Sequence, residues 1–255
     1  MSKNLIGAAV LALAALTPVV GLAQEDEAAR PYVYGIYYQC DVTRQELADE
    51  IVEAAFSGAY DAALEAGQIQ SWGWLAHHTG NEWRRLLYHS APDLDGLFAT
   101  LESTSGAIDE ANPEMARALG DICGSHVDYV WRYVIGSRAD NLPEDRGDAA
   151  FSVYYNCKMS KEQRADEIVT DVFAPVFNRH VGAGKLESWG WMEHMIGGEY
   201  RRIWTMSGAE HSDVLDARDA IYTELMESYR DAMQEFDEIC YSHQDMMWNI
   251  VMEAP

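Results

Sequence analysis

The chain has 255 residues, of which 42 are Asp or Glu and 18 are Lys or Arg, so its formal net charge is −24. Such an acidic surface repels nucleic acid and anionic lipid, which excludes both as expected partners. The scarcity of Lys is also compatible with adaptation to salt, in which case the stability of the protein should rise with salt.

The first 23 residues are typical of a secretory signal peptide. Lys3 supplies a positive charge, an apolar run extends from Leu5 to Val20, and Gly21-Leu22-Ala23 is a small-residue cleavage site. A single-pass anchor is the alternative, but the run is short and contains Pro18. No later run is apolar enough to span a bilayer. We therefore expect an exported protein, periplasmic or secreted, with about 230 mature residues, enough for one large or two small domains.

The mature chain contains the same unit twice. A shift of 117 positions places the stretch SWGWLAHHTGNEWRR at 71–85 on SWGWMEHMIGGEYRR at 188–202. The same shift aligns the two halves without a gap at their other landmarks, which predicts an internal duplication. We place the repeats at 32–135 and 149–252 and expect the polar residues 136–148 between them to form a linker.

Each repeat is predicted to begin with an alternating aromatic strand, at 32–40 and 151–157. A helix follows, and Thr43 with Glu46 and Ser160 with Gln163 predict capping boxes at its start. Gly58 and Pro175 occupy the same offset and predict a kink or break in both helices. The next two strands lie within the duplicated stretch, with residues 79–81 and 196–198 as their turns.

A second helical region begins near Asp95 in one repeat and Asp213 in the other. Asn112-Pro113 predicts a further short helix in the first repeat, whereas the second shows one continuous helical pattern. The segments 127–135 and 244–252 close the repeats as predicted strands, although the Met-rich second segment could also end a helix. The predicted order is β-α-β-β-α-β, the ferredoxin-like split unit, so the fold class is α+β.

Four cysteines in an exported chain favour disulfides over thiol chemistry. Cys40 and Cys123 are separated by the same distance as Cys157 and Cys240, which predicts one bridge in each repeat. In the ferredoxin-like order the first and last strands are antiparallel neighbours. The topology therefore brings the same pairs together independently of their spacing.

Two ferredoxin-like units with aromatic strands in one chain resemble the dimeric α+β barrel superfamily, which includes the antibiotic-biosynthesis-monooxygenase-like proteins. The resemblance covers the element order of both repeats and includes no catalytic motif. It implies an intrachain pseudo-dimeric barrel with the helices outside, as a monomer or as a homodimer. Family members include cofactor-independent oxygenases of aromatic substrates, haem-handling enzymes and proteins without known activity, so the fold alone does not decide the function.

Strand alternation divides the duplicated stretch into two faces. One face is nearly unchanged between the repeats, and its small residues leave room for a ligand or for a closely packed element. It consists of Ser71, Gly73, Leu75 and His77, and of Ser188, Gly190, Met192 and His194. The other face carries Trp pairs, which predict core packing under a helix or, alternatively, a stacking platform.

Histidines are the first candidates for chemistry. His77 and His194 could each act as a general base or a metal ligand, or could bind a neighbouring loop at a strand end. His126 with Asp128 and His243 with Asp245 place a carboxylate two residues from an imidazole on the same face, where it could orient the ring. The alternative for these pairs is a polar cluster that fixes the strand beside the disulfide.

Repeated Arg residues are the second group of candidates. Arg85 and Arg202 could bind an anionic substrate group bidentately, or could form ion pairs with Glu50, Glu82 or their counterparts. Tyr38 and Tyr155 could line a pocket or fill the core. His77, His126 and Asp128 would suit iron or zinc, but no short ligand spacing supports such a site, and we predict no cofactor.

The sequence thus predicts an exported protein that binds a small aromatic or anionic molecule in each half. Its chemistry would be cofactor-independent oxygenation or a lyase-like reaction. The alternative is a non-catalytic structural or partner-binding module of the cell envelope. No nucleophile elbow, phosphate-binding Gly loop or Ser-His-Asp signature is present in the sequence.

Overall fold

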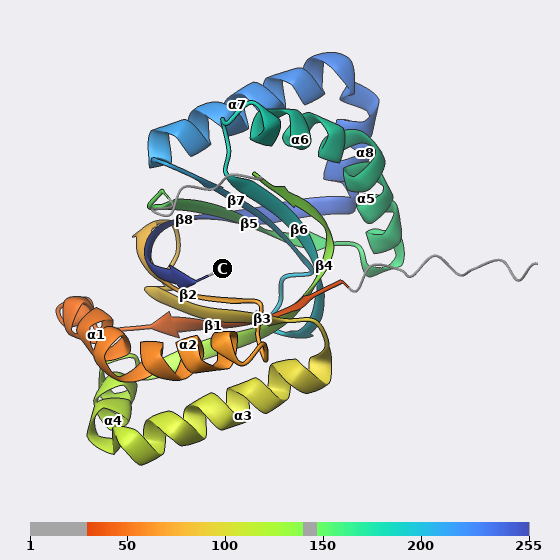
Figure 1. Cartoon of the computed structure of the whole chain (residues 1–255). Helices are drawn as coiled ribbons and strands as arrows, with labels where there is room; N and C mark the ends of the chain where they lie inside the picture. Colours follow the sequence, from red (N-terminus) through yellow and green to blue (C-terminus); the bar gives the residue numbers. More distant parts are fainter. Residues whose placement is uncertain (1–29, 140–146, 255) are drawn as a thin grey trace, which may run out of the picture.

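The computed structural model describes residues 30–139 and 147–254, and both repeats have the same series of elements (Figure 1). The predicted signal peptide and most of the predicted linker lie outside these residues. The first repeat comprises β1 (Tyr32–Gln39), α1 (Gln45–Ile51), α2 (Ser57–Glu65), β2 (Ser71–Thr79), β3 (Arg85–Ala91), α3 (Leu94–Ala111), α4 (Pro113–Ile122) and β4 (Ser125–Arg138). The second comprises β5 (Ala149–Cys157), α5 (Glu162–Ile168), α6 (Ala174–Gly182), β6 (Ser188–Gly197), β7 (Arg202–Gly208), α7 (His211–Ser228), α8 (Arg230–Ile239) and β8 (Cys240–Ala254).

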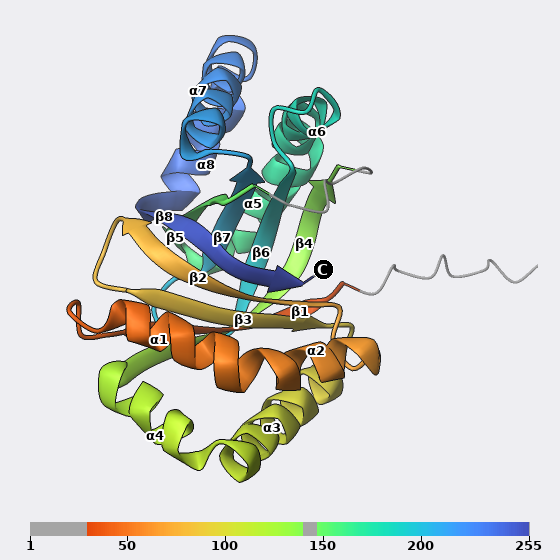
Figure 2. The same ribbon diagram turned by 60° about the vertical axis from the view of Figure 1, so that its left-hand side comes forward.

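The eight strands close into one antiparallel barrel in the order β1-β3-β2-β8-β5-β7-β6-β4. Within each repeat the first and last strands are neighbours, as the ferredoxin-like order predicts. Two further pairings, β2 with β8 and β4 with β6, join the repeats. Helices α1–α4 cover one side of the barrel and α5–α8 cover the opposite side (Figures 1 and 2). The predicted pseudo-dimeric α+β barrel and the closing strands are confirmed.

Both predicted disulfides are confirmed. Cys40 is bonded to Cys123 and Cys157 to Cys240, each pair 83 positions apart. Each bridge ties the end of the first strand of a repeat to the start of its last strand. Disulfides of this kind are typical of proteins outside the reducing cytoplasm. No helix within the described residues is both long and apolar enough to cross a membrane.

The helix starts differ from the predicted capping boxes. Helix α1 begins at Gln45 without a side-chain cap, because Thr43 donates its backbone N–H and its hydroxyl to Asp41 Oδ1, at 2.9 and 2.8 Å. In the second repeat a short 3₁₀ turn at Met159–Lys161 precedes α5, which also lacks a side-chain cap. The Asp41 side chain thus takes up the Thr43 backbone N–H and hydroxyl, which the predicted capping box of the first repeat would have used.

The predicted kink is a π-helical turn in both repeats, at Val52–Phe56 and Val169–Phe173, directly before α2 and α6. The predicted continuous helix in the second repeat is wrong, since it breaks at Tyr229. Tyr229 adopts φ −136° and ψ 35°, close to −137° and 53° at its counterpart Asn112. The shared packing of the two repeats, rather than a local breaker residue, therefore sets this break.

Core residues occupy three layers. The outer face of each half-barrel packs under its helices, and the inner faces of both halves meet inside the barrel. The Trp pairs belong to the outer cores: Trp74 Nε1 donates to Asp49 at 2.7 Å and Trp191 Nε1 donates to Asp166 at 2.8 Å. The prediction that they are core residues under a helix is confirmed. The face of β2 and β6 with Ser and Gly therefore points into the barrel.

Candidate functional site

The barrel interior contains a cavity of about 520 Å³ toward the end at which β2 and β6 begin. Both repeats contribute to its wall, so this interior offers one shared space rather than one in each half. Apolar residues form much of the lining, with Val33, Leu75, Leu86, Met192, Ile203 and Ile250 among them. Tyr and Trp side chains of β1, β3, β4 and β5 complete the wall. A mostly apolar interior with a few polar groups is typical of a small-molecule site.

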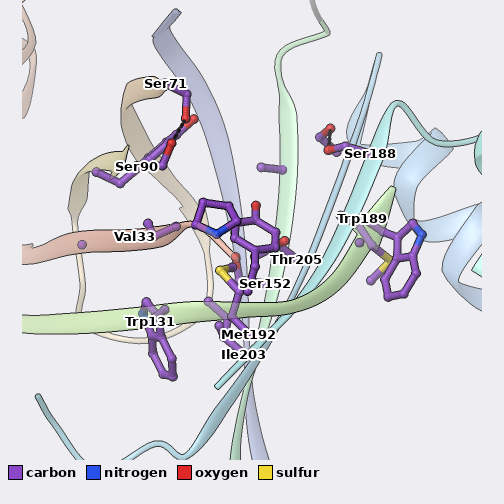
Figure 3. A pocket seen from close by; sticks show the side chains of 18 of the residues that line it. Val33, Ser71, Ser90, Trp131, Ser152, Ser188, Trp189, Met192, Ile203 and Thr205 are labelled. Carbon is purple, nitrogen blue, oxygen red and sulfur yellow. Dashed lines mark hydrogen bonds between the residues drawn. The ribbon is translucent and has the colours of Figure 1, made fainter. Parts of the chain in front are cut away.

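Two serine pairs mark the mouth of this cavity, and one serine of each pair belongs to the face of β2 and β6 that is repeated in the sequence. Ser71 Oγ lies 2.7 Å from Ser90 Oγ, and Ser188 Oγ lies 2.7 Å from Ser207 Oγ. Figure 3 shows Ser71 and Ser90 on one side and Ser188 on the other. The two pairs are related by the shift of 117 positions, so they are equivalent in the two repeats. Each pair adds hydroxyl groups to an otherwise apolar rim.

Below one serine pair, the cavity carries a phenol and a carboxylate. The Tyr88 hydroxyl donates a hydrogen bond to Glu253 Oε1, and both residues line the cavity. The Tyr88 ring lies over Gly73, where an added Cβ would approach ring atom Cε1 to 2.5 Å. Gly73 therefore admits the ring, because any larger residue would displace it. This resolves the two interpretations of the Ser-Gly face: it lines the cavity, and its glycine accommodates a packed tyrosine.

The opposite wall has different side chains at the equivalent positions. Thr205 replaces Tyr88, and Gly136 replaces Glu253. An added Cβ at Gly136 would lie 2.7 Å from the Trp189 carbonyl oxygen and 3.2 Å from Gly190 Cα, both backbone atoms. The backbone there leaves no room for an acidic side chain. The cavity is thus symmetric in its serines and asymmetric in its phenol and carboxylate.

Two guanidinium groups also line the mouth, Arg30 before β1 and Arg138 at the end of β4. Among the described residues that line the cavity, these two positive groups are accompanied by one carboxylate, Glu253. Such groups favour an anionic substituent at the mouth rather than in the apolar interior.

Aromatic rings fill the other end of the barrel. Tyr37 and Tyr154, equivalent in the two repeats, meet with ring centroids 5.6 Å apart, and Trp83 lies 4.5 Å from Tyr37 and 5.1 Å from Tyr154. Tyr37 is 2 % exposed and Tyr154 is fully buried. Burial raises the pKa of both phenols far above the usual range, so both remain neutral and protonated. The cavity ends on this layer.

His77 and His194 lie at the filled end, and neither lines the cavity. His77 Nδ1 is 2.9 Å from the Trp83 carbonyl oxygen, and His194 Nε2 is 3.2 Å from the Gly197 carbonyl oxygen. Burial and the nearby Arg84 lower the pKa of His77, and burial and Arg201 lower that of His194. These contacts match the alternative of strand-end histidines that bind their own hairpin loops.

Arg85 and Arg202 lie on the outer face of the barrel, away from the cavity. Arg85 is 4 % exposed and forms a bidentate ion pair with Asp49 of α1, with Nε–Oδ1 and Nη2–Oδ2 distances of 2.6 and 2.7 Å. Arg202 binds Asp166 of α5 in the same way, at 2.8 and 2.7 Å, and also contacts Glu162 at 3.1 Å. The partners are thus neither Glu50 nor Glu82. Each pair fastens a helix to the third strand of its repeat.

The His-x-Asp pairs also lie on the outer face. His126 Nε2 is 3.5 Å from Asp128 Oδ1, and His243 Nε2 is 3.7 Å from Asp245 Oδ1. Tyr34 donates a hydrogen bond of 2.9 Å to Asp128. Each histidine also packs beside a predicted substrate-binding tyrosine: Tyr38 lies beside His126 and Tyr155 beside His243, both with ring centroids 5.6 Å apart. The structure therefore brings Tyr38, His126 and Asp128 together, but separates them from His77 and from the cavity.

A metal centre or a histidine-held haem does not fit these side chains. Within residues 30–139 and 147–254, no three His, Cys, Asp or Glu residues are grouped closely enough to hold a metal ion. None of the eight histidines lines the cavity, and all four cysteines are in disulfides. Haem iron is usually held by His, Cys, Met or Tyr. Among the described residues, the cavity lining includes neither an imidazole nor a thiolate.

Sequence reasoning found one wall of the cavity and missed its polar centre. The repeated Ser-Gly face pointed to Ser71 and Ser188, whereas Tyr88 and Glu253 carried no repeated signal. Their counterparts differ in type, so a search for features shared by both repeats passes over them. A search for polar residues present in only one repeat would have found them.

No family model and no curated protein matches the sequence. Solved structures do match over both repeats. A candidate monooxygenase from Lactobacillus acidophilus NCFM aligns over 88 % of this chain and 96 % of its own, with a TM-score of 0.60 and 8 % identity. An anthrone oxidase-like protein aligns over 89 % and 94 %, with a TM-score of 0.56 and 12 % identity.

A third match is a mutant chlorite dismutase from Candidatus Nitrospira defluvii in complex with cyanide. It aligns over 90 % of this chain and 92 % of its own, with a TM-score of 0.52 and 12 % identity. At these identities the likeness concerns the fold. The chain is therefore a pseudo-dimeric member of the dimeric α+β barrel fold, with both halves supplied by one polypeptide.

Proposed function

We propose that the protein binds one small, largely aromatic molecule in the barrel interior and oxygenates it with dioxygen, without a metal or an organic cofactor. The observation that carries the proposal is the shared cavity of about 520 Å³, with apolar and aromatic walls and a hydroxyl rim. The fold likeness to candidate monooxygenases and to an anthrone oxidase-like protein supports the reaction class.

A methylene group flanked by aromatic rings is a suitable reacting centre. Its oxidation would follow R₂CH₂ + O₂ → R₂C=O + H₂O, in which the carbon is oxidised by four electrons and dioxygen is reduced to water and a carbonyl oxygen. Anthrone has such a methylene group between two rings and is a practical probe. An anionic substituent on the natural ligand would meet Arg30 and Arg138 at the mouth.

The chain is further proposed to act outside the cytoplasm after loss of residues 1–23. The two disulfides and the signal-like start of the sequence support this location. Expression of the full gene product in a bacterial host tests it. The mass of the periplasmic or secreted protein should match a chain that begins at Gln24, whereas an uncleaved chain would contradict the proposed export.

Binding of anthrone under anaerobic conditions, followed by tryptophan fluorescence, tests the site, because Trp131 lies in the barrel interior and lines the cavity. A Ser152→Phe variant places a bulky ring in the cavity wall and should weaken binding at least tenfold. Ser105→Phe is the matched control, since Ser105 is exposed on α3 and its counterpart in the second repeat is the aromatic Tyr222.

Oxygen uptake with anthrone then distinguishes an enzyme from a binding module. Uptake above the uncatalysed rate that is lost in Ser152→Phe supports the oxygenase. Binding without oxygen uptake would favour the non-catalytic alternative. Absence of binding by anthrone and by smaller aromatic compounds would refute the proposal altogether.

A further inference from the structure

Glu253 is the one carboxylate among the described residues that line the cavity. It lies on β8 of the second repeat, and its hydrogen-bond donor Tyr88 lies on β3 of the first. The pairing of β2 with β8 brings them together, since Gly73 lies beneath Tyr88 and is paired with Glu253 in the barrel. The charged group thus belongs to a site that neither repeat forms alone.

The geometry points to Glu253 as the general base of this cavity and to Tyr88 as the residue that positions it. This inference rests on the proposed function and specifies its substrate class: an aromatic molecule with an acidic C–H bond beside a carbonyl group or an aromatic ring. Such a molecule can react with dioxygen once it has lost a proton, and the cavity provides one carboxylate to remove it.

A Glu253 carboxylate oxygen forms an O–H bond as the ligand C–H bond breaks, and the electron pair stays on the ligand as a delocalised carbanion. Dioxygen accepts electrons from this carbanion and forms a C–O bond, and the proton on Glu253 passes to the peroxide, which gives R₂CH–OOH and restores the carboxylate. Loss of water from the hydroperoxide then leaves the ketone. Dioxygen is the only oxidant required.

Tyr88 acts through Glu253. A hydrogen bond donated to a carboxylate favours its charged form and fixes the direction of its lone pairs. The Gly73 position holds the phenol in place, since the ring packs directly on the strand. At the equivalent place on the opposite wall, Gly136 leaves no room for a side chain, so the chemistry is restricted to one side of the cavity.

Hydrogen–deuterium exchange at the methylene carbon of anthrone, in anaerobic D₂O, isolates the proton transfer from the reaction with oxygen. The wild-type protein should accelerate the exchange, and Glu253→Gln should reduce the acceleration by about 100-fold or more, the range of general-base catalysis. The dissociation constant of anthrone should change less than threefold in this variant. Glu110→Gln, at an exposed site on α3, is the control for the loss of one negative charge.

Tyr88→Phe tests the positioning role. This variant should exchange deuterium more slowly at saturating anthrone, with the dissociation constant of anthrone changed less than threefold, because the carboxylate loses the hydrogen bond that orients it. A merely structural role for Tyr88 would lower the melting temperature and leave the exchange rate at saturating anthrone unchanged. Such a result would overturn the role given to Tyr88.

The outcomes separate this inference from the proposed function. If the wild-type protein binds anthrone but Glu253→Gln exchanges its deuterium equally fast, Glu253 is not the base although the binding site stands. Binding by the wild type without any accelerated exchange overturns the inference as well. If the wild type binds no aromatic probe, the proposed function itself fails.

Discussion

Replacing Asp49 by Ala should destabilise the protein strongly, because it leaves the Arg85 guanidinium buried without an anionic partner. Arg85 is 4 % exposed, and its other acceptors, the Gln45 amide oxygen at 2.7 Å and the Arg84 carbonyl at 2.8 Å, are both neutral. Trp74 Nε1 would also lose its acceptor. Breaking a buried ion pair from one side costs about 3–5 kcal/mol, and we expect a value in that range.

The second repeat provides a matched comparison. Asp166→Ala removes the same contacts from Arg202 and Trp191, but Glu162 stands where the first repeat has Gln45 and remains 3.1 Å from Arg202. Burial alone would raise the pKa of Glu162, but its contacts with Arg201 and Arg202 lower it, so this carboxylate stays charged at neutral pH. A hydrogen bond to a charged group contributes about 1.5–3 kcal/mol. Asp166→Ala should therefore cost about 1.5 kcal/mol less than Asp49→Ala.

Urea unfolding at pH 7 with intact disulfides measures both free energies of unfolding. Asp49→Ala, Arg85→Met and their combination form a double-mutant cycle, and the combination should cost less than the sum of the two single changes, since it leaves no buried charge. A cost below about 1 kcal/mol for Asp49→Ala, typical of exposed pairs, would refute the reasoning. So would a larger cost for Asp166→Ala. Unchanged stability together with weaker anion binding would instead restore Arg85 as a ligand-binding residue.

Replacing Cys40 and Cys123 together by Ala should lower the unfolding free energy by about 4.5 kcal/mol in the chain-entropy model, measured by urea unfolding; a loss below about 1 kcal/mol would contradict it. Burial lowers the pKa of His89, which is 1 % exposed, so its stabilising effect is present above the unfolded value near 6.5 and is lost as the pH falls below it. His89→Met, the residue in the second repeat, should therefore lose less stability than the wild type between pH 7 and pH 5, and equal losses would refute this. Gly73→Ala should cost about 1–3 kcal/mol through its contact with the Tyr88 ring and should reduce anthrone exchange, whereas an unperturbed variant would show that the ring moves freely.

Much of the architecture could be predicted because the sequence contains it twice. A segment that is ambiguous in one repeat, such as Met246-Met247-Trp248, becomes a strand when its counterpart reads as one. The cysteine spacing and the strand order assigned the disulfides independently. The helix break at Tyr229 could not be predicted, since its local sequence favours a helix and the packing of the repeat overrides that preference.

The candidate site was less predictable for a physical reason. Tyr88 and Glu253 are 165 positions apart and meet only because β2 of one repeat pairs with β8 of the other. A pattern within either repeat cannot reveal such a contact. The face of each residue could be assigned by alternation, but not which of two faces would enclose a space. Arg85 lies on the outer face of the barrel, where it is buried under α1 rather than exposed to the cavity. Its partner is Asp49 and not the adjacent Glu50.

The β2–β8 and β4–β6 pairings have a consequence for how the molecule comes apart. Two copies of a unit in one chain suggest two independent melting steps, as for two domains that share few contacts. Here the longest strands, β4 and β8, are hydrogen-bonded to both halves at once. If one half unfolded, the other half would lose backbone hydrogen bonds along two strands, and the apolar barrel interior would be exposed to water. Thermal denaturation should therefore be a single cooperative event, and damage to either half should be felt throughout the molecule.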